Sequence, residues 1–168
     1  CVGILFVLTG FSLFLARVAI FPWWYRIADV GVRFSSCSNY QSRVYVSCSD
    51  PERFYQANFS EVNFEEDVNG RRSKVAGWLI KADSSAEVPL VILIHGGGVD
   101  RRAMSKHAKY LHQSGFEILQ IDCENHGLNY LNRDGISFGL NEAYSVAASV
   151  QWAKRKWPSR PVILFGTS

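Results

Sequence analysis

The sequence predicts an α/β domain in which an antiparallel hairpin leads into parallel strands with crossover helices, preceded by a transmembrane helix. Continuous apolar runs that end in glycine-rich turns indicate buried strands, and apolar residues at helical spacing separate these runs. An uncharged apolar stretch at the N-terminus indicates the membrane helix. We therefore expect a signal anchor over residues 1–25, a linker over residues 26–57 and the domain over residues 58–168.

The N-terminal stretch carries no charge from Cys1 to Ala16, and Arg17 is followed by four more apolar residues. With Arg17 reaching toward the interface, such a helix approaches the roughly 30 Å width of the hydrocarbon core. The tryptophans and tyrosine at 23–25 suit an interfacial aromatic belt. A cleaved signal peptide and a buried core helix are the alternatives, but no convincing A-x-A-like cleavage site follows the apolar run.

The predicted domain begins with a hairpin and a buried strand. Residues 61–65 alternate between polar and apolar side chains, Asp67-Val68-Asn69-Gly70 gives a turn, and residues 74–80 form the returning strand. The apolar run over residues 88–94 is typical of a strand that is buried on both faces, and it ends in His95-Gly96-Gly97-Gly98.

Two helices and two further strands complete the pattern. Asp100 is the expected N-cap of a helix that carries Met104, Ala108 and Leu111 and ends before Gly115. A strand over residues 116–121 ends in Asp122 to Gly127, and a second helix carries apolar residues from Leu140 to Trp157 on one face. The last strand, residues 162–165, leads to Gly166-Thr167-Ser168. Sites in such sheets lie at the carboxyl ends of the strands, where these glycine-containing segments fall.

This series of motifs resembles the first half of an α/β-hydrolase. It is most similar to the membrane-anchored serine hydrolases akin to monoacylglycerol lipases, lysophospholipases and serine-aminopeptidase-like enzymes. The motifs are Gly77-Trp78-Leu79-Ile80, His95-Gly96-Gly97-Gly98, Asp122 with His126-Gly127, Ser137-Phe138-Gly139 with Glu142, and Gly166-Thr167-Ser168. The chain departs from the usual pattern at Glu124-Asn125, Asn129 and Ser145, which leaves the subfamily open.

The resemblance implies that Ser168 is the nucleophile, held exposed by a sharp turn after the last strand. Backbone N–H groups stabilise a developing oxyanion, and Gly97 is the expected donor, with Gly98 as the second choice. An ordinary turn serine and a tight glycine turn are the alternatives. The other motif residues then have structural roles: His95, Gly96, Asp122, His126, Gly127 and Gly166.

The family order of nucleophile, acid and histidine places the catalytic acid and base beyond Ser168. Because the chain begins with Cys1 and stops at the expected nucleophile, we expect it to be a fragment that is inactive by itself. The exposed edge of its last strand would also make this fragment fold poorly.

In the full-length protein we expect hydrolysis of acyl esters through an acyl-enzyme, with lipid-like substrates favoured by the membrane anchor. The alternatives are a catalytically silent binding protein of the same fold and a serine peptidase. The scattered basic residues and net charge of +3 argue against a nucleic-acid partner. No spacing of histidine and cysteine suggests zinc and no glycine motif suggests a nucleotide, so neither a metal nor a cofactor is expected.

The orientation in the membrane has opposing signals. Arg26 and Arg33 favour a cytosolic domain, whereas Cys37 and Cys48, which could close a small loop, favour an oxidising compartment. Asn58-Phe59-Ser60 is a glycosylation sequon, which is used only in the secretory lumen. We favour a single-pass protein of the endomembranes or the cell surface with a lumenal or extracellular domain.

Overall fold

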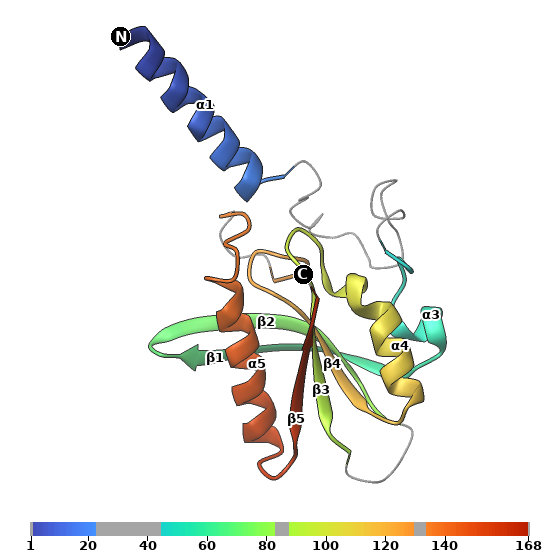
Figure 1. Ribbon diagram of the computed structural model, residues 1–168. Coiled ribbons are helices and arrows are strands. Elements are labelled where there is room, and N and C mark those ends of the chain that lie inside the picture. Colours follow the sequence, from blue (N-terminus) through green and yellow to red (C-terminus); the bar gives the residue numbers. More distant parts are fainter. Residues whose placement is uncertain (1, 23–44, 83–87, 130–133, 168) are drawn as a thin grey trace.

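The computed structural model describes residues 2–22, 45–82, 88–129 and 134–167, and its centre is a five-stranded sheet (Figure 1). The strand order is β1-β2-β4-β3-β5. The strands are β1 (Phe59–Val68), β2 (Arg71–Ile80), β3 (Leu90–Ile94), β4 (Glu117–Asp122) and β5 (Val162–Gly166). The pairs β1–β2 and β2–β4 are antiparallel, whereas β4–β3 and β3–β5 are parallel. The predicted hairpin followed by parallel strands is therefore confirmed.

The hairpin turn explains the register of the first two strands. Val68 pairs with Arg71, so the turn consists of Asn69 and Gly70, which have φ values of 54° and 79°. Positive φ at both central residues is the requirement of a type I′ turn, which asparagine followed by glycine meets best. Asp67 Oδ1 also accepts a hydrogen bond of 2.8 Å from Gly70 N.

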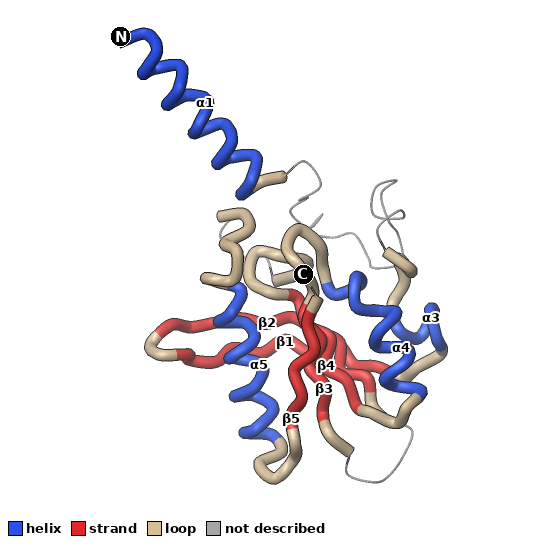
Figure 2. The backbone as a smooth tube through the Cα atoms, in the orientation of Figure 1, coloured by secondary structure: helices blue, strands red, loops and turns tan. Residues whose placement is uncertain are grey.

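Helices cover both faces of the sheet (Figure 2). The short 3-10 helix η1 (Arg101–Met104) and α4 (Ser105–Gln113) contact β3 and β4 on one face, and α5 (Glu142–Lys156) contacts β1, β2 and β3 on the other. Asp100 is the N-cap of η1, as predicted, because its side chain accepts from Arg102 N.

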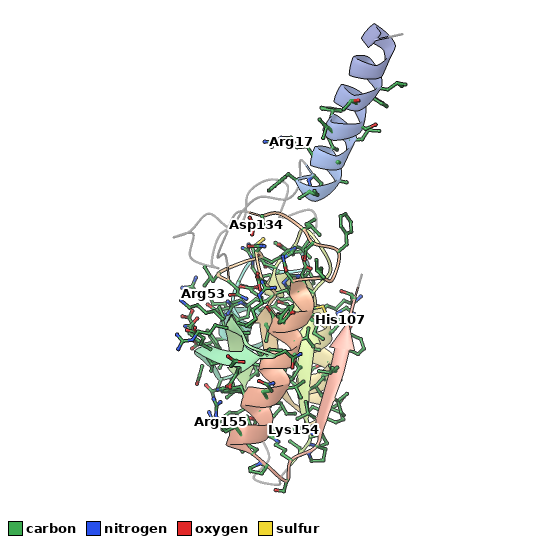
Figure 3. All side chains as sticks on the ribbon, turned by 90° about the vertical axis from the view of Figure 1, so that its left-hand side faces the viewer. Arg17, Arg53, His107, Asp134, Lys154 and Arg155 are labelled. Atoms are coloured by element: carbon green, nitrogen blue, oxygen red, sulfur yellow. The ribbon has the colours of Figure 1, made fainter. Side chains whose placement is uncertain are left out.

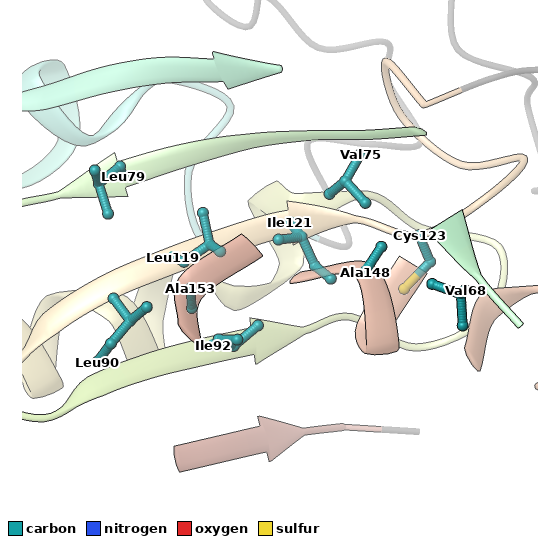
Figure 4. Packing of buried hydrophobic residues seen from close by; sticks show 10 residues of the cluster. All are labelled: Val68, Val75, Leu79, Leu90, Ile92, Leu119, Ile121, Cys123, Ala148 and Ala153. Carbon is teal, nitrogen blue, oxygen red and sulfur yellow. The ribbon is translucent and has the colours of Figure 1, made fainter. Parts of the chain in front are cut away.

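Two apolar cores result, because successive residues of a strand point to opposite faces. In β3, Leu90 and Ile92 face α5, and Val91 and Leu93 face α4. The core under α5 contains Val68, Val75, Leu79, Leu90, Ile92, Leu119, Ile121, Cys123, Ala148 and Ala153 (Figure 4). Both faces of β3 are thus buried, as its uninterrupted apolar sequence predicted.

The strands begin or end a few residues away from the predicted positions, and three differences have a clear physical reason or consequence. A short helix, α3 (Pro51–Tyr55), lies in the segment predicted to be a linker, where Asp50 caps Arg53 N at 2.9 Å. The strand predicted from residue 88 starts at Leu90, because Pro89 has no N–H to donate to a neighbouring strand. Leu140, predicted on the second helix, lies in the turn before α5 and is exposed.

The apolar N-terminal stretch forms α1 (Val2–Ile20). The last turn of this helix lies next to the domain, and the rest of the helix extends away from it (Figure 1). Arg17 on α1 and Asp134 on the domain lie near this junction (Figure 3). Leu8, Phe11, Leu13, Phe14, Leu15 and Val18 are exposed apolar side chains of this helix. Over the described part of the chain, no helix combines the length and the apolarity that crossing a membrane requires.

Candidate active site

Three predicted motifs come together at the carboxyl ends of the parallel strands. His95 follows β3, Asp122 ends β4, and Gly166 ends β5. Thr167 N donates to Ile94 O at 3.1 Å, which continues the pairing of β5 with β3 by one residue. Ser168 lies outside the described residues, so the structure describes the predicted site as far as Thr167.

A buried ion pair fixes the end of β4. Arg101 Nη2 lies 2.7 Å from Asp122 Oδ2, and the two side chains are 1% and 0% exposed. Asp122 also accepts hydrogen bonds of 2.7 Å from the backbone N–H groups of Arg101 and Leu128. Burial alone would raise the pKa of Asp122, but the charge and hydrogen bonds of Arg101 outweigh it and lower the pKa. The carboxylate thus holds two loops together in its charged form.

Gly127 has to be glycine for two reasons. Its φ of 52° lies in the left-handed region, which residues other than glycine and asparagine seldom adopt. A Cβ atom at this position would overlap the carboxylate of Asp122. The backbone of the loop therefore packs directly on the carboxylate.

His95 and His126 both connect loops through their ring nitrogens. Cys123 N donates to His95 Nε2 at 3.0 Å, and Gly98 N donates to His126 Nε2 at 3.0 Å. A nitrogen that accepts carries no proton, so each neutral ring is protonated at Nδ1, which lies 2.7 Å from Gly96 O in His95 and 2.8 Å from Glu124 O in His126. Both nitrogens of each ring are thus engaged by the backbone. Burial, followed by the neighbouring His95, lowers the pKa of His126.

The two glycines predicted to form an oxyanion hole differ in their surroundings. Gly98 has a φ of 79°, and its N–H donates to His126. Gly97 is exposed and lines a cavity, and its N–H has no hydrogen-bond partner within the described residues. Gly97 is therefore the one of the two whose N–H remains available to a ligand.

The cavity has a volume of about 570 Å³ and lies beside the ends of β3 and β5. Most of its lining is apolar and comes from the loop before α5, the first turns of α5 and the end of α1. The lining residues that matter most here are Gly97, Thr167, Ile136, Phe138, Ala19 and Pro22. This volume lies within the roughly 300–1,000 Å³ that small-molecule sites occupy.

Glu142 organises the loop that forms one side of the cavity. Its carboxylate accepts hydrogen bonds of 2.8 Å from Ser137 N and Gly139 N, and a further one from Ser137 Oγ. Burial raises the pKa of Glu142, but these hydrogen bonds outweigh the effect and lower it. The carboxylate is thus committed to the loop, as a capping residue at the start of a helix is.

Sequence reasoning missed two parts of this site. Arg101, the partner of Asp122, is one of two adjacent arginines that look like a solvated cluster in the sequence, yet both are buried. Arg102 pairs with Asp100 at 2.6 Å. The contribution of Ala19 and Pro22 to the cavity was also missed, because their stretch was assigned wholly to the membrane.

The cysteines and the sequon are placed as follows. Cys48 is disulfide-bonded, Cys37 lies outside the described residues, and Cys123 is a buried free thiol. Burial raises the pKa of Cys123. Asn58 is exposed directly before β1. Over the described part of the chain, no group of three or more histidine, cysteine or acidic side chains is arranged to hold a metal ion.

Comparison with known proteins identifies the fold. The structure is similar to the esterase Pf2001 of Pyrococcus furiosus, with a TM-score of 0.54 and 23% identity over 68% of this chain and 43% of the esterase. A second crystal form of that esterase matches with a TM-score of 0.52 and 24% identity, over 68% and 41% of the two chains. The chain thus has an α/β-hydrolase fold and spans less than half the length of this esterase.

A carboxyl esterase of Bacillus coagulans is similar at a TM-score of 0.49 and 19% identity, over 64% of this chain and 36% of the esterase. No protein-family model matches the chain. No curated protein matches it either.

Proposed function

We propose that the protein is a serine hydrolase that cleaves acyl esters, with Ser168 as its nucleophile. One observation carries the proposal: Gly97, whose N–H is unpaired within the described residues, lines the same apolar cavity as Thr167, the residue before Ser168. Hydrolysis of an acyl ester requires three features in one place: a nucleophile, a hydrogen-bond donor for the oxyanion and an apolar space for the acyl chain. That Pf2001 is an esterase of this fold agrees with the proposal.

In the proposed reaction, Ser168 Oγ attacks the carbonyl carbon and gives its proton to a general base. The negative charge that develops on the carbonyl oxygen is stabilised by the Gly97 N–H. The tetrahedral intermediate collapses to an acyl-serine, and the leaving alcohol takes up the proton. Water then attacks the acyl-serine through the same steps and releases a carboxylic acid.

Within residues 1–168, the proposal gives no histidine the role of general base. His95 and His126 each use both ring nitrogens for backbone contacts, and His112 Nε2 lies 3.0 Å from Lys81 O. The proposal takes the base and the acid from residues beyond Ser168, in the order that the family resemblance implies. Residues 1–168 alone are then expected to be inactive.

We also propose that the N-terminal stretch attaches the protein to a membrane and that the domain faces the lumen or the cell exterior. The exposed apolar side chains of α1, among them Phe11 and Phe14, support membrane attachment. The disulfide at Cys48 and the exposed Asn58 support an oxidising compartment. Treatment with a glycosidase tests the orientation: a shift in gel mobility that is absent in Asn58→Gln is expected, and no shift argues for a cytosolic domain.

Hydrolysis of p-nitrophenyl esters by the whole protein tests the catalytic proposal. We expect a measurable kcat/KM that falls by about a factor of 10⁴ or more in Ser168→Ala, since the attacking group is removed. Cys123→Ser is the control, because it changes a buried free thiol in the cavity lining, and it is expected to keep most of the activity. A folded wild-type protein without activity would instead favour a silent binding protein.

A further inference from the structure

The last turn of α1 is part of the cavity wall. Ala19 and Pro22 line the cavity together with Ile136 and Phe138 of the loop before α5. The helix assigned to the membrane and the domain assigned to catalysis are therefore joined at the substrate cavity itself. Figure 1 shows the end of α1 close to the loop before α5, on the side of the domain toward which the parallel strands point.

The contact between α1 and the domain is closely fitted. Ile136 N donates a hydrogen bond of 3.0 Å to Ile20 O, one of the helix carbonyls that has no partner inside the helix. Gly135 has a φ of 76°, and a Cβ atom there would lie 2.5 Å from Ile20 Cγ2, 2.7 Å from Ile20 O and 2.9 Å from Phe21 Cε1. Gly135 thus allows the helix end to pack directly on the loop backbone.

The chemistry of the cavity favours a hydrocarbon chain. Ile136, Phe138 and Val146 line it together with Ala19 and Pro22. The polar side chains in the lining are committed elsewhere, because the Glu142 carboxylate accepts from Ser137 and Gly139, and His95 bonds Cys123 N and Gly96 O. A polar ligand would lose hydrogen bonds to water and find few partners in this cavity, whereas methylene groups make no hydrogen bonds and gain free energy when they leave water.

We propose that the end of α1 forms the acyl-chain wall of the site, so that the chain of a medium- or long-chain acyl ester lies between α1 and the loop before α5. The ester carbonyl then lies at Gly97. This inference deepens the proposed hydrolase function and rests on it for the position of the carbonyl. It assigns to Ala19, Pro22 and Gly135 a role in selecting substrates by chain length.

Gly135→Ala in the whole protein tests the wall while leaving the apolar surface of α1 unchanged. Displacing α1 removes the contacts of two or more methylene groups, which corresponds to about tenfold in kcat/KM for a dodecanoyl ester relative to an acetyl ester. Gly70→Ala is the matched control, since Gly70 has a φ of 79° and open space around its Cβ position in the distant hairpin turn. It should change the ratio by less than about twofold.

Ala19→Trp tests the same wall from the helix side and leaves the loop intact if Gly135→Ala fails to fold. The indole fills the cavity, so the dodecanoyl ester should lose about tenfold in kcat/KM while the acetyl ester keeps its value. Ala16→Trp, one turn earlier on α1 and outside the cavity lining, is the control with the same substitution.

A readout without catalysis separates this inference from the proposed function. Dodecanoic acid with a photoreactive diazirine at its chain end should label the peptide that contains Ile136 and Val146, and Ala19→Trp should reduce this labelling about tenfold. If labelling depends on Ala19 but the protein has no esterase activity, the proposed hydrolase function is contradicted while the proposed acyl-chain wall is supported. If neither Gly135→Ala nor Ala19→Trp changes the labelling or the chain-length preference, the proposal that α1 forms the acyl-chain wall is wrong.

Discussion

Two parts of the candidate site are built in opposite ways: the polar network at the carboxyl ends of the strands, which we call the floor of the site, and part of the apolar cavity lining, which we call its mouth. The floor, which we define as Arg101, Asp122, His95, His126 and Gly127, is buried and polar, and its charged and ring groups are held by hydrogen bonds. The mouth, defined as Ala19, Pro22, Ile136 and Phe138, is largely apolar, and Phe138 is 75% exposed. In the proposed hydrolase, the floor would fix the backbone positions on which catalysis depends, while the mouth would contact the variable part of a substrate. Changes in the floor should therefore cost stability, and changes in the mouth should alter selectivity.

The largest expected effect comes from breaking the ion pair in the floor. Asp122→Ala leaves the Arg101 guanidinium buried without its counter-charge, which should lower the free energy of unfolding by about 3–5 kcal/mol. Urea denaturation of the whole protein measures the loss. Glu65→Ala is the control, because it removes an exposed ion pair of 3.7 Å with Arg72 and should cost less than about 1 kcal/mol. Equal losses in the two variants would show that the buried Asp122–Arg101 pair contributes no more to the free energy of unfolding than an exposed pair does.

Gly127→Ala should be the next most damaging change. The new methyl group overlaps the Asp122 carboxylate in a left-handed backbone, and overpacking with backbone strain should together cost about 2–4 kcal/mol. Gly115→Ala separates the two causes, since Gly115 has a φ of 87° but open space around it, and should cost only about 1–2 kcal/mol. Similar unfolding midpoints for the two variants would argue against close packing on Asp122.

The pH dependence of stability should report on His126. Its pKa is lowered in the folded protein, so the unfolded chain binds the proton more readily, and stability is lost as pH falls below the ordinary value of 6.5. The slope between about pH 6.5 and 5 should be at most about 1.4 kcal/mol per pH unit. The difference between wild type and His126→Gln isolates this contribution from that of Glu124, whose raised pKa acts in the opposite sense. A difference that does not change with pH would show that His126 titrates normally.

The smallest effect on stability is expected in the mouth. Phe138→Ala removes a side chain that is mostly exposed, so the unfolding free energy should change by less than about 0.5 kcal/mol. The hydrolysis of a dodecanoyl ester should nevertheless fall several-fold while an acetyl ester is unaffected. A large loss of stability in Phe138→Ala would mean that the mouth, like the floor, is part of the packed core.

The sheet could be predicted from the sequence because its signals are local. The apolar run before His95 is buried on both faces, Asn69-Gly70 sets the hairpin, and Asp100 caps the following helix. The short helix α3 was missed although Asp50-Pro51 is a typical N-terminal signal, because one turn of helix carries no apolar periodicity.

The site was predictable only in part. Glycine motifs at strand ends located the loops, and their order carried the resemblance to hydrolases. The pairing of Arg101 with Asp122 depends on a contact between residues 21 positions apart, which no pattern in the sequence marks. The same holds for Gly135, whose fit against Ile20 depends on two segments separated by more than a hundred residues. The floor and the mouth are formed by long-range contacts of this kind, which cannot be predicted from local periodicity in the sequence.

Labelling with a fluorophosphonate probe tests the central claim most directly. The probe phosphonylates an activated serine, so the whole protein should incorporate one label, and peptide mass spectrometry should locate it at Ser168. Ser168→Ala should abolish the label, whereas the cavity variant Cys123→Ser should retain it. Label that persists in Ser168→Ala, or a folded protein that takes up none, would contradict the assignment of Ser168 as the nucleophile.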